Sequence, residues 1–185
     1  MTQHEQLIRL LATRSARRGN FTLASGRQST LYIDARLTTM SPDGLVLIGA
    51  LGFARIQEHW TADSVGGLTL GADPISYAIS YASATTHAPL QAFTVRKEAK
   101  AHGTGKLIEG PFRAGDRAVI IEDVITTGAS ALKAASAVEG AGGLVIGVLA
   151  LVDREEGGRE AIEATGISVI SIVKAQELLP LLPAE

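Results

Sequence analysis

The sequence predicts an α/β fold on a parallel sheet, because strand-like and helix-like patterns alternate along the chain. Four apolar runs end just before Gly71, Arg96, Glu122 and Asp153, and a polar or glycine-rich segment follows each run. Unbroken apolar runs are typical of strands buried on both faces of a parallel sheet. The four segments would therefore open on one edge of the sheet, where ligands bind in open α/β folds.

Composition narrows the class of protein. The 185 residues are 46% hydrophobic but only 4% aromatic, which suits a core of Val, Ile, Leu and Ala. The net charge of -2 argues against nucleic acid or a membrane as the main partner. The chain has no cysteine, the N-terminus lacks a signal-peptide core, and the longest apolar run, Leu144 to Val152, is too short to span a bilayer. We expect a cytoplasmic protein with a single domain over residues 1–185.

The N-terminal segment, residues 1–40, is expected to form a small hood over a core of residues 41–175. Residues 4–18 predict a helix that ends before Gly19. Residues 21–36 predict two short strands around a turn at Ser25 and Gly26. The C-terminal tail, residues 176–185, is apolar and interrupted by proline, and we expect it to pack on the surface.

A helix is predicted from Ser41 to about Trp60, with Ser41 as its N-cap and Pro42 at its first position. It is apolar nearly all round, so it is buried, or it is shared between the domain and a partner subunit, which we favour. A strand and tight loop follow at 64–71. Glycines at 66, 67 and 71 would let the backbone approach a ligand closely, although an ordinary strand-to-helix turn is the alternative.

The next strand, residues 90–95, leads into a segment at 96–106 that carries four cations and almost nothing to bury. By itself this composition indicates a solvated loop, and a catalytic lid needs the same mobility. After residue 140, strands are predicted at 144–152 and 167–173, with a short helix at 159–165 between them. Arg154, at the end of the first of these strands, could fork onto a planar carboxylate or be an exposed turn residue.

The central stretch, residues 118–130, joins an apolar run to two acids, Glu122 and Asp123, and then to a small polar turn before an Ala-rich helix. Free N–H groups at a helix start can cradle a phosphate. Carboxylates repel phosphate, so they should face sugar hydroxyls or a hydrated cation. A ribose 5-phosphate satisfies both halves of the stretch. The alternatives are a solvated acid pair beside an ordinary turn, or an acid pocket like that of response regulators.

Three strings resemble those of orotate phosphoribosyltransferases, which belong to the type I phosphoribosyltransferases. Residues 118–130 resemble the signature for phosphoribosyl diphosphate (PRPP), residues 21–34 the Phe-x-Leu-x-Ser-Gly signature, and residues 95–106 the flexible loop. The resemblance implies a roughly five-stranded parallel sheet flanked by helices, with a small N-terminal hood. It implies transfer of the 5-phosphoribosyl group from PRPP to orotate in pyrimidine synthesis, giving orotidine 5′-monophosphate and pyrophosphate. It also implies Mg²⁺ as cofactor.

The same resemblance implies roles for individual residues. Catalytic roles fall to Lys100, His102, Glu122 and Asp123. PRPP would be bound by Arg96, Lys97, Lys100, His102, Glu122, Asp123, Val124, Ile125, Thr126, Thr127, Gly128, Ala129 and Ser130. Orotate would be bound by Thr126, Arg154, Tyr32 and Ile33, and pyrophosphate by the loop of Thr69, Leu70 and Gly71. Mg²⁺ would be held mainly by PRPP oxygens, with Asp123 as the candidate protein contact.

Two departures from the family pattern bear on these roles. Ala24 and Leu70 stand where some relatives carry lysine. The sequence leaves open whether the segment around Ala24 still contacts a phosphate, and the loop at 69–71 should rely on its backbone amides. The resemblance also implies a homodimer in which lid residues complete the neighbour's site. Two alternatives share the central stretch: a PRPP-binding regulator that could dispense with the lid cations, and a transferase for a purine or uracil that would lack the other two strings.

Overall fold

The computed structural model describes residues 1–22, 28–98 and 106–183. Its centre is a six-stranded sheet in the order β5-β4-β3-β6-β7-β8. Five strands run parallel, and only the edge strand β5 is antiparallel. The strands are β3 (Ser64–Leu68), β4 (Gln91–Val95), β5 (Ile108–Glu109), β6 (Arg117–Ile125), β7 (Leu144–Asp153) and β8 (Val169–Lys174). The predicted parallel sheet is confirmed.

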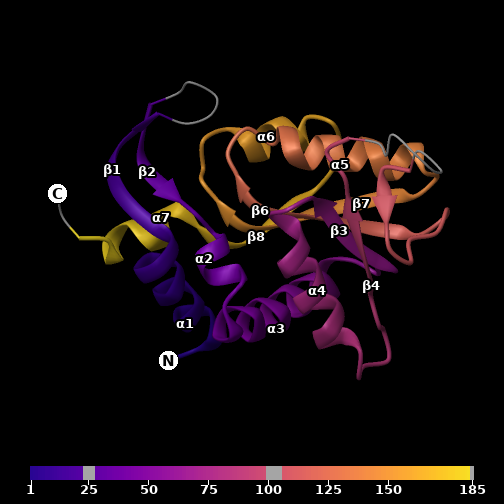
Figure 1. Ribbon diagram of the computed structural model, residues 1–185, viewed down its shortest axis with the longest axis horizontal. Helices are drawn as coiled ribbons and strands as arrows, with labels where there is room; N and C mark the ends of the chain where they lie inside the picture. The colour runs from indigo at the N-terminus through magenta and orange to yellow at the C-terminus, as the bar shows by residue number, and fades with distance from the viewer. Residues whose placement is uncertain (23–27, 99–105, 184–185) are drawn as a thin grey trace.

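Helices cover both faces of this sheet (Figure 1). One face carries α3 (Pro42–His59) and α4 (Ala72–Ser83), and the other carries α5 (Ala129–Gly140) and α6 (Gly158–Glu163). Along β6, Val119 and Ile121 pack with the α3 and α4 side, whereas Ala118 and Ile120 pack with α5. All four are fully buried. The unbroken apolar run in the sequence therefore reflects a strand with helices on both faces.

The chain reverses its direction of travel across the sheet between β3 and β6. From β3 it moves outward to β4, and it then returns to place β6 on the other side of β3. The loops that leave β3 and β6 consequently diverge at the carboxyl edge of the sheet. Such a switch point leaves a crevice for ligands.

The N-terminal helix is shorter than predicted. Helix α1 (Gln3–Leu10) continues as a π-helical segment, Leu11–Ser15, and strand β1 (Ala16–Thr22) begins directly after it. Arg17 and Arg18, expected in the helix, instead pair with residues of strand β2 (Gln28–Ile33) in an antiparallel hairpin. The predicted stop at Gly19 is therefore wrong, because pairing with β2 outweighs the local helical pattern. Both strands of the predicted hairpin are present, and its turn lies outside the described residues.

Strand β6 is longer than the predicted run and contains the two acids instead of ending before them. It continues because β7 runs beside it, pairing Glu122 with Ala150 and Ile125 with Asp153. The acids are thus held by the sheet itself and not by a loop.

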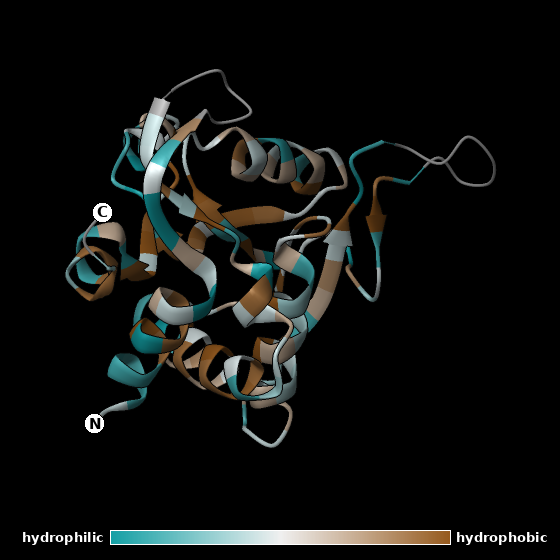
Figure 2. Cartoon of the chain, turned by 60° about the vertical axis from the view of Figure 1, so that its left-hand side comes forward, coloured by the Kyte–Doolittle hydropathy of each residue, from teal (hydrophilic) through white to brown (hydrophobic). Residues whose placement is uncertain are grey.

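The C-terminal tail does not simply pack on the surface. After α7 (Ala175–Leu178) and a 3₁₀ turn, Leu179–Leu181, the side chains of Leu178 and Leu182 are buried in the same cluster as Leu7 and Leu11. The tail thus covers the hydrophobic core on the side where the hairpin of β1 and β2 lies (Figure 2). None of the helices in the described part of the chain is both long and apolar enough to cross a membrane.

Candidate active site

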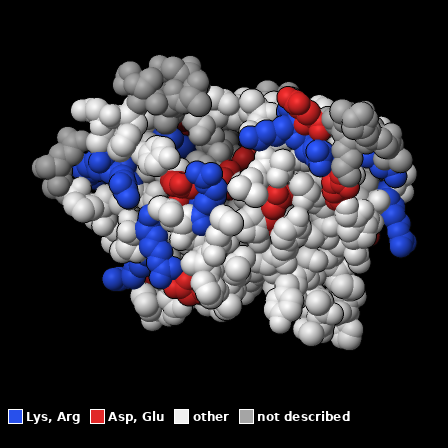
Figure 3. All heavy atoms as spheres, viewed as in Figure 1, with Lys and Arg blue, Asp and Glu red and all other residues white. Residues whose placement is uncertain are grey.

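Two cavities meet at the switch point between β3 and β6. The larger, of about 300 Å³, is lined by Tyr32, Ile33, Asp34, Ala35, Arg36, Leu68, Thr69, Leu70, Gly71, Lys97, Glu122, Asp123 and Ser130. The smaller, of about 100 Å³, is lined by Glu122, Val124, Ile125, Thr126, Thr127, Gly128, Ala129 and Ser130. Glu122 and Ser130 belong to both. The structure thus brings together most of the residues that the sequence analysis singled out, and Figure 3 shows acidic and basic side chains side by side around a hollow on this face.

The acid pair carries less charge than its sequence indicates. Glu122 is 9% exposed. Burial, together with the neighbouring carboxyl of Asp123, raises the pKa of Glu122 to about 9. Glu122 is therefore protonated at neutral pH. Asp123 is half-buried, and its Oδ1 accepts a hydrogen bond of 2.8 Å from the Val124 N–H. A site with one negative charge instead of two repels a phosphorylated ligand less.

The small cavity is formed by the turn that begins α5. Gly128 has φ 79°, a left-handed conformation that favours glycine. A Cβ there would also lie 2.7 Å from the Gly158 carbonyl and 2.8 Å from Ile162 Cγ1, so the turn packs tightly against α6. The first N–H groups of this twelve-residue helix have no partners within the helix, and that of Ala129 donates to Thr127 Oγ1 at 3.5 Å. These features suit a phosphate group.

Asp73 anchors the loop after β3 through hydrogen bonds. The sequence analysis did not assign this residue to the site. The Thr69 hydroxyl donates to Asp73 Oδ2 at 2.7 Å, and the Thr94 hydroxyl donates to Asp73 Oδ1 at 2.8 Å. Asp73 is buried, so these bonds tie the loop to both α4 and β4. The sequence offered only the position of an acid in the first turn of a helix.

Only one of the three glycines near this loop borders the cavity. Gly71 does so, whereas Gly66 and Gly67 lie inside β3. A Cβ on Gly66 would overlap Phe93, and one on Gly67 would overlap the Ile121 carbonyl. The expectation that all three glycines approach a ligand is therefore wrong for Gly66 and Gly67, because close packing between neighbouring elements needs them.

The hairpin contributes Tyr32 and Ile33 to the larger cavity, together with an ion pair that was not predicted as part of the site. Arg36 bonds to Asp34 through Nε at 2.8 Å and Nη2 at 3.0 Å. This pair lowers the pKa of Asp34 and raises that of Arg36. The sequence placed Asp34 within a motif, but it offered no signal that Arg36 would turn toward the same cavity.

Arg154 is buried, so the alternative of an exposed turn arginine is wrong. Its Nη2 donates to Ser29 Oγ at 2.5 Å, to the Leu31 carbonyl at 2.6 Å and to Glu156 Oε1 at 2.8 Å. Its backbone N–H donates to the Ile125 carbonyl at 3.1 Å, beside the phosphate turn. Arg154 lines neither of the two cavities as the described residues shape them.

The two described cations at the start of the lid point differently. Lys97 lines the larger cavity, and its carbonyl accepts a hydrogen bond of 2.8 Å from Lys133 Nζ. Arg96 is directed toward Glu109, with Nη1 and Oε1 3.7 Å apart, and is not among the lining residues. Lys100, His102 and Ala24 lie outside the described residues.

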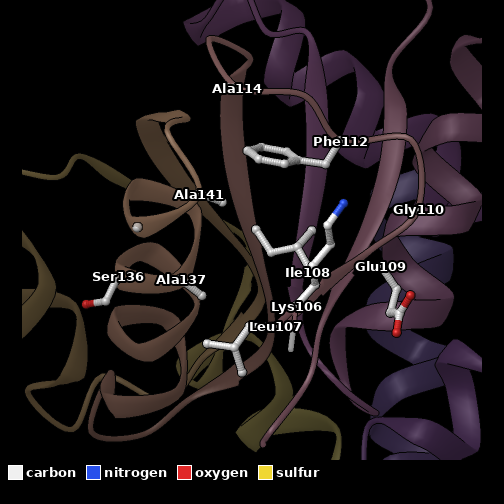
Figure 4. Close-up of a pocket in the computed structure, with 11 residues that line it drawn as sticks. Lys106, Leu107, Ile108, Glu109, Gly110, Phe112, Ala114, Ser136, Ala137 and Ala141 are labelled. Carbon is white, nitrogen blue, oxygen red and sulfur yellow. The ribbon is translucent and has the colours of Figure 1, made fainter. Parts of the chain in front are cut away.

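A larger cavity, of about 690 Å³, lies away from the switch point, between the segment around β5 and the end of α5 (Figure 4). Leu107, Ile108 and Phe112 supply most of its apolar lining, and the Ser136 hydroxyl points away from them. None of the predicted site residues lines it. It lacks both the acids and the phosphate turn, so the two cavities at the switch point remain the candidate active site.

The parallel sheet, with an acid pair and a phosphate turn at its switch point, defines the class of type I phosphoribosyltransferases. Adenine phosphoribosyltransferase from Saccharomyces cerevisiae, at 18% identity, shares this fold with a TM-score of 0.68 over 91% of this chain and 99% of that chain.

Closer relatives narrow the class. Orotate phosphoribosyltransferase from Aquifex aeolicus is 47% identical over 182 residues, which cover 97% of this chain and 99% of that protein. The crystal structure of Mycobacterium tuberculosis H37Rv orotate phosphoribosyltransferase in complex with PRPP is 40% identical, with a TM-score of 0.80 over 96% of this chain and 99% of that chain. The chain belongs to the orotate phosphoribosyltransferase family. No protein-family model matches the sequence.

Proposed function

We propose that this protein transfers the 5-phosphoribosyl group of PRPP to orotate, giving orotidine 5′-monophosphate and pyrophosphate in the cytoplasmic synthesis of pyrimidines. The observation that carries the proposal is the meeting of the acid pair, the phosphate turn and the Thr69–Gly71 loop around one crevice. A ligand with ribose hydroxyls, a 5-phosphate and a diphosphate matches these three parts in that order.

In the proposed reaction, the anomeric C–O bond of PRPP breaks and pyrophosphate leaves with the electron pair. A ring nitrogen of orotate then forms the new C–N bond. The sugar passes through an oxocarbenium-like state, so catalysis depends on neutralising charge on the leaving group. Lys97, Arg96, Lys100 and His102 supply positive charge, and backbone amides of the loop at 69–71 bind the diphosphate. No strong protein base is needed if orotate binds as an anion.

Glu122 and Asp123 can bind the ribose hydroxyls with different kinds of hydrogen bond. A protonated Glu122 carboxyl can donate and accept hydrogen bonds, whereas a carboxylate can only accept them. Residues Thr127 to Ser130 would hold the 5-phosphate at the start of α5. Tyr32, Ile33, Thr126 and Arg154 would surround orotate, with Arg154 directed at its carboxylate.

Mg²⁺ is part of the proposal as cofactor. The described residues contain no group of three or more His, Asp or Glu that could hold a metal. The half-buried Asp123 carboxylate at the cavity suits an ion that keeps several waters and takes most of its ligands from a substrate. When bound, Mg²⁺ would neutralise charge on the diphosphate.

We also propose a homodimer in which lid residues complete the neighbour's site. Apolar side chains are exposed on consecutive helices, including Val46 on α3 at 69% and Tyr81 on α4 at 84%. Leu37 on α2 (Arg36–Thr39) and Met40 just after it are exposed as well. Apolar surface on adjacent helices is typical of a protein interface.

Incubation of the enzyme with PRPP, Mg²⁺ and one base at a time tests the proposed activity. Orotate consumption is followed by its absorbance and pyrophosphate by a coupled assay. We expect turnover with orotate alone. Binding of PRPP without consumption of any base would indicate a regulator, and turnover of uracil or a purine would indicate a transferase for another base.

A further inference from the structure

The hydrogen bonds of the Arg154 guanidinium are distributed unevenly over its nitrogen atoms. Its Nη2 has two protons but three acceptors, which are Ser29 Oγ, the Leu31 carbonyl and Glu156 Oε1. Its Nε is buried and has no hydrogen-bond partner among the described residues. Within the described part of the chain, an arginine side chain that is 4% exposed therefore has one nitrogen with three acceptors and one nitrogen with none.

A ligand carboxylate cannot bind Arg154 in a fork while this arrangement lasts. A carboxylate forks onto guanidinium either through Nε and Nη2 or through both Nη atoms. Both modes need a proton of Nη2, so at least one present acceptor must leave. The fork through Nε would also satisfy the nitrogen that has no partner among the described residues.

Two of the three acceptors are fixed to each other within β2. The Ser29 hydroxyl donates to the Leu31 carbonyl at 3.0 Å and accepts from the Leu31 N–H at 3.2 Å. Glu156, in contrast, lies in the turn between β7 and α6, and its side chain is 24% exposed. Replacing the Glu156 carboxylate breaks no hydrogen bond of strand β2, so Glu156 is the acceptor that an incoming carboxylate can replace.

We infer that Glu156 is a positioning residue for the proposed reaction: its carboxylate pairs with Arg154 in the free enzyme and exchanges with the carboxylate of the base. Exchange of one carboxylate for another keeps the buried guanidinium paired throughout, which avoids the large penalty of an unpaired buried charge. It also lets Glu156 return to Arg154 when the nucleotide product leaves. The inference rests on the proposed function, because it needs a base that carries a carboxylate.

Substitution Glu156→Gln tests the exchange, since it keeps the shape and removes the charge that competes for Arg154. We expect orotate and orotidine 5′-monophosphate to bind about 5- to 20-fold more tightly, because a charge-assisted hydrogen bond no longer has to be broken. Uracil, which has no carboxylate, should bind with a Kd within about twofold of that for wild type, and so should PRPP. Dissociation constants come from calorimetric titration.

The matched control is Glu155→Gln, which removes the same charge one residue away. Glu155 Oε2 accepts a hydrogen bond of 3.0 Å from the Gln176 N–H, on the side of the turn occupied by α7 and not by Arg154. Orotate affinity should not change in this variant. In the double variant Arg154→Ala/Glu156→Gln, the gain from glutamine should vanish, because it acts only through Arg154.

A purely structural role for Glu156 predicts the opposite sign, since loss of a support for Arg154 would weaken orotate. Unchanged or weaker orotate binding in Glu156→Gln would overturn the inference while the proposed function stands. Glu156→Ala is a second test, and we expect this variant to bind orotate more tightly as well. Failure of the wild-type protein to bind orotate at all would overturn the proposed function and, with it, the inference.

Discussion

Gly71 faces the carboxylate of Asp123 so closely that a Cβ on Gly71 would overlap Asp123 Oδ2. The two residues belong to the two halves of the crevice, Gly71 to the loop after β3 and Asp123 to β6. Gly71 has φ -61° and ψ -42°, which any residue can adopt. Alanine would therefore strain no backbone dihedral there, and the carboxylate is the group that must move.

We predict that Gly71→Ala lowers kcat/KM about 100-fold, because a displacement of about 1 Å at a reacting centre can cost that much. The free energy of unfolding should change by less than about 1 kcal/mol. The control is Gly140→Ala, whose added Cβ would meet nothing within 4 Å. Steady-state kinetics and urea unfolding of both variants provide the comparison. Equal activities of the two variants would show that Asp123 need not hold its present position.

The raised pKa of Glu122 predicts a pH dependence of stability. The pKa of Glu122 rises from 4.5 to about 9 on folding, so above pH 4.5 the unfolded chain ionises while the folded protein keeps the proton. The folded state then binds more protons than the unfolded state, and stability falls as the pH rises through this window. Carboxyls with a lowered pKa, such as Asp63 at about 2, contribute the opposite trend at low pH.

Comparison with Glu122→Gln isolates this contribution, because glutamine mimics the protonated acid and other groups cancel. We expect the free energy of unfolding of the variant, relative to wild type, to increase steadily between pH 5 and pH 8. Urea denaturation of the ligand-free proteins at several pH values measures it. Parallel pH profiles for the two proteins would mean that Glu122 is ionised in the folded state.

Arg154→Ala should weaken orotate far more than PRPP. The loss should be about 2–4 kcal/mol in orotate binding, because the base carboxylate would be left without its partner. The control is Arg159→Ala, which removes an arginine paired with Glu163 on the surface of α6. Separate KM values for orotate and PRPP show whether the loss is specific to orotate. An equal loss for orotate and PRPP would remove Arg154 from the base site.

Mixing two inactive variants tests whether the lid acts across a dimer. Lys100→Ala and Asp123→Asn should each lose about 10²- to 10³-fold in kcat, judged from the loss of one transition-state contact. After subunit exchange, about half of the dimers are mixed, and one site in each mixed dimer has both intact residues if Lys100 acts in trans. About a quarter of wild-type activity should then return. With exchange verified by mass spectrometry, a mixture no more active than its parents would place Lys100 in its own subunit's site.

By itself the sequence determined the five parallel strands after residue 40 and the nature of the central stretch, but neither β5 nor α7 was predicted. Period and composition are local properties, so an apolar run such as Ala118 to Ile121 predicts a strand without knowledge of its neighbours. The same holds for the helix start at Ser41, whose hydroxyl accepts a hydrogen bond of 3.2 Å from the Gly44 N–H. Glu122, Asp123 and the turn that follows were recognisable for the same reason.

Only the tertiary structure decided where strands end, which acids are neutral and which side chains meet. Strand β1 starts at Ala16 because β2 pairs with it, and β6 reaches Ile125 because β7 runs beside it. Asp73 joins the site through Thr94, which is 21 residues away in the chain. Arg36 pairs with nearby Asp34, but only the fold places this pair beside the acids of β6. Pairing, burial and the pKa of Glu122 depend on residues far along the chain, and no local pattern contains them.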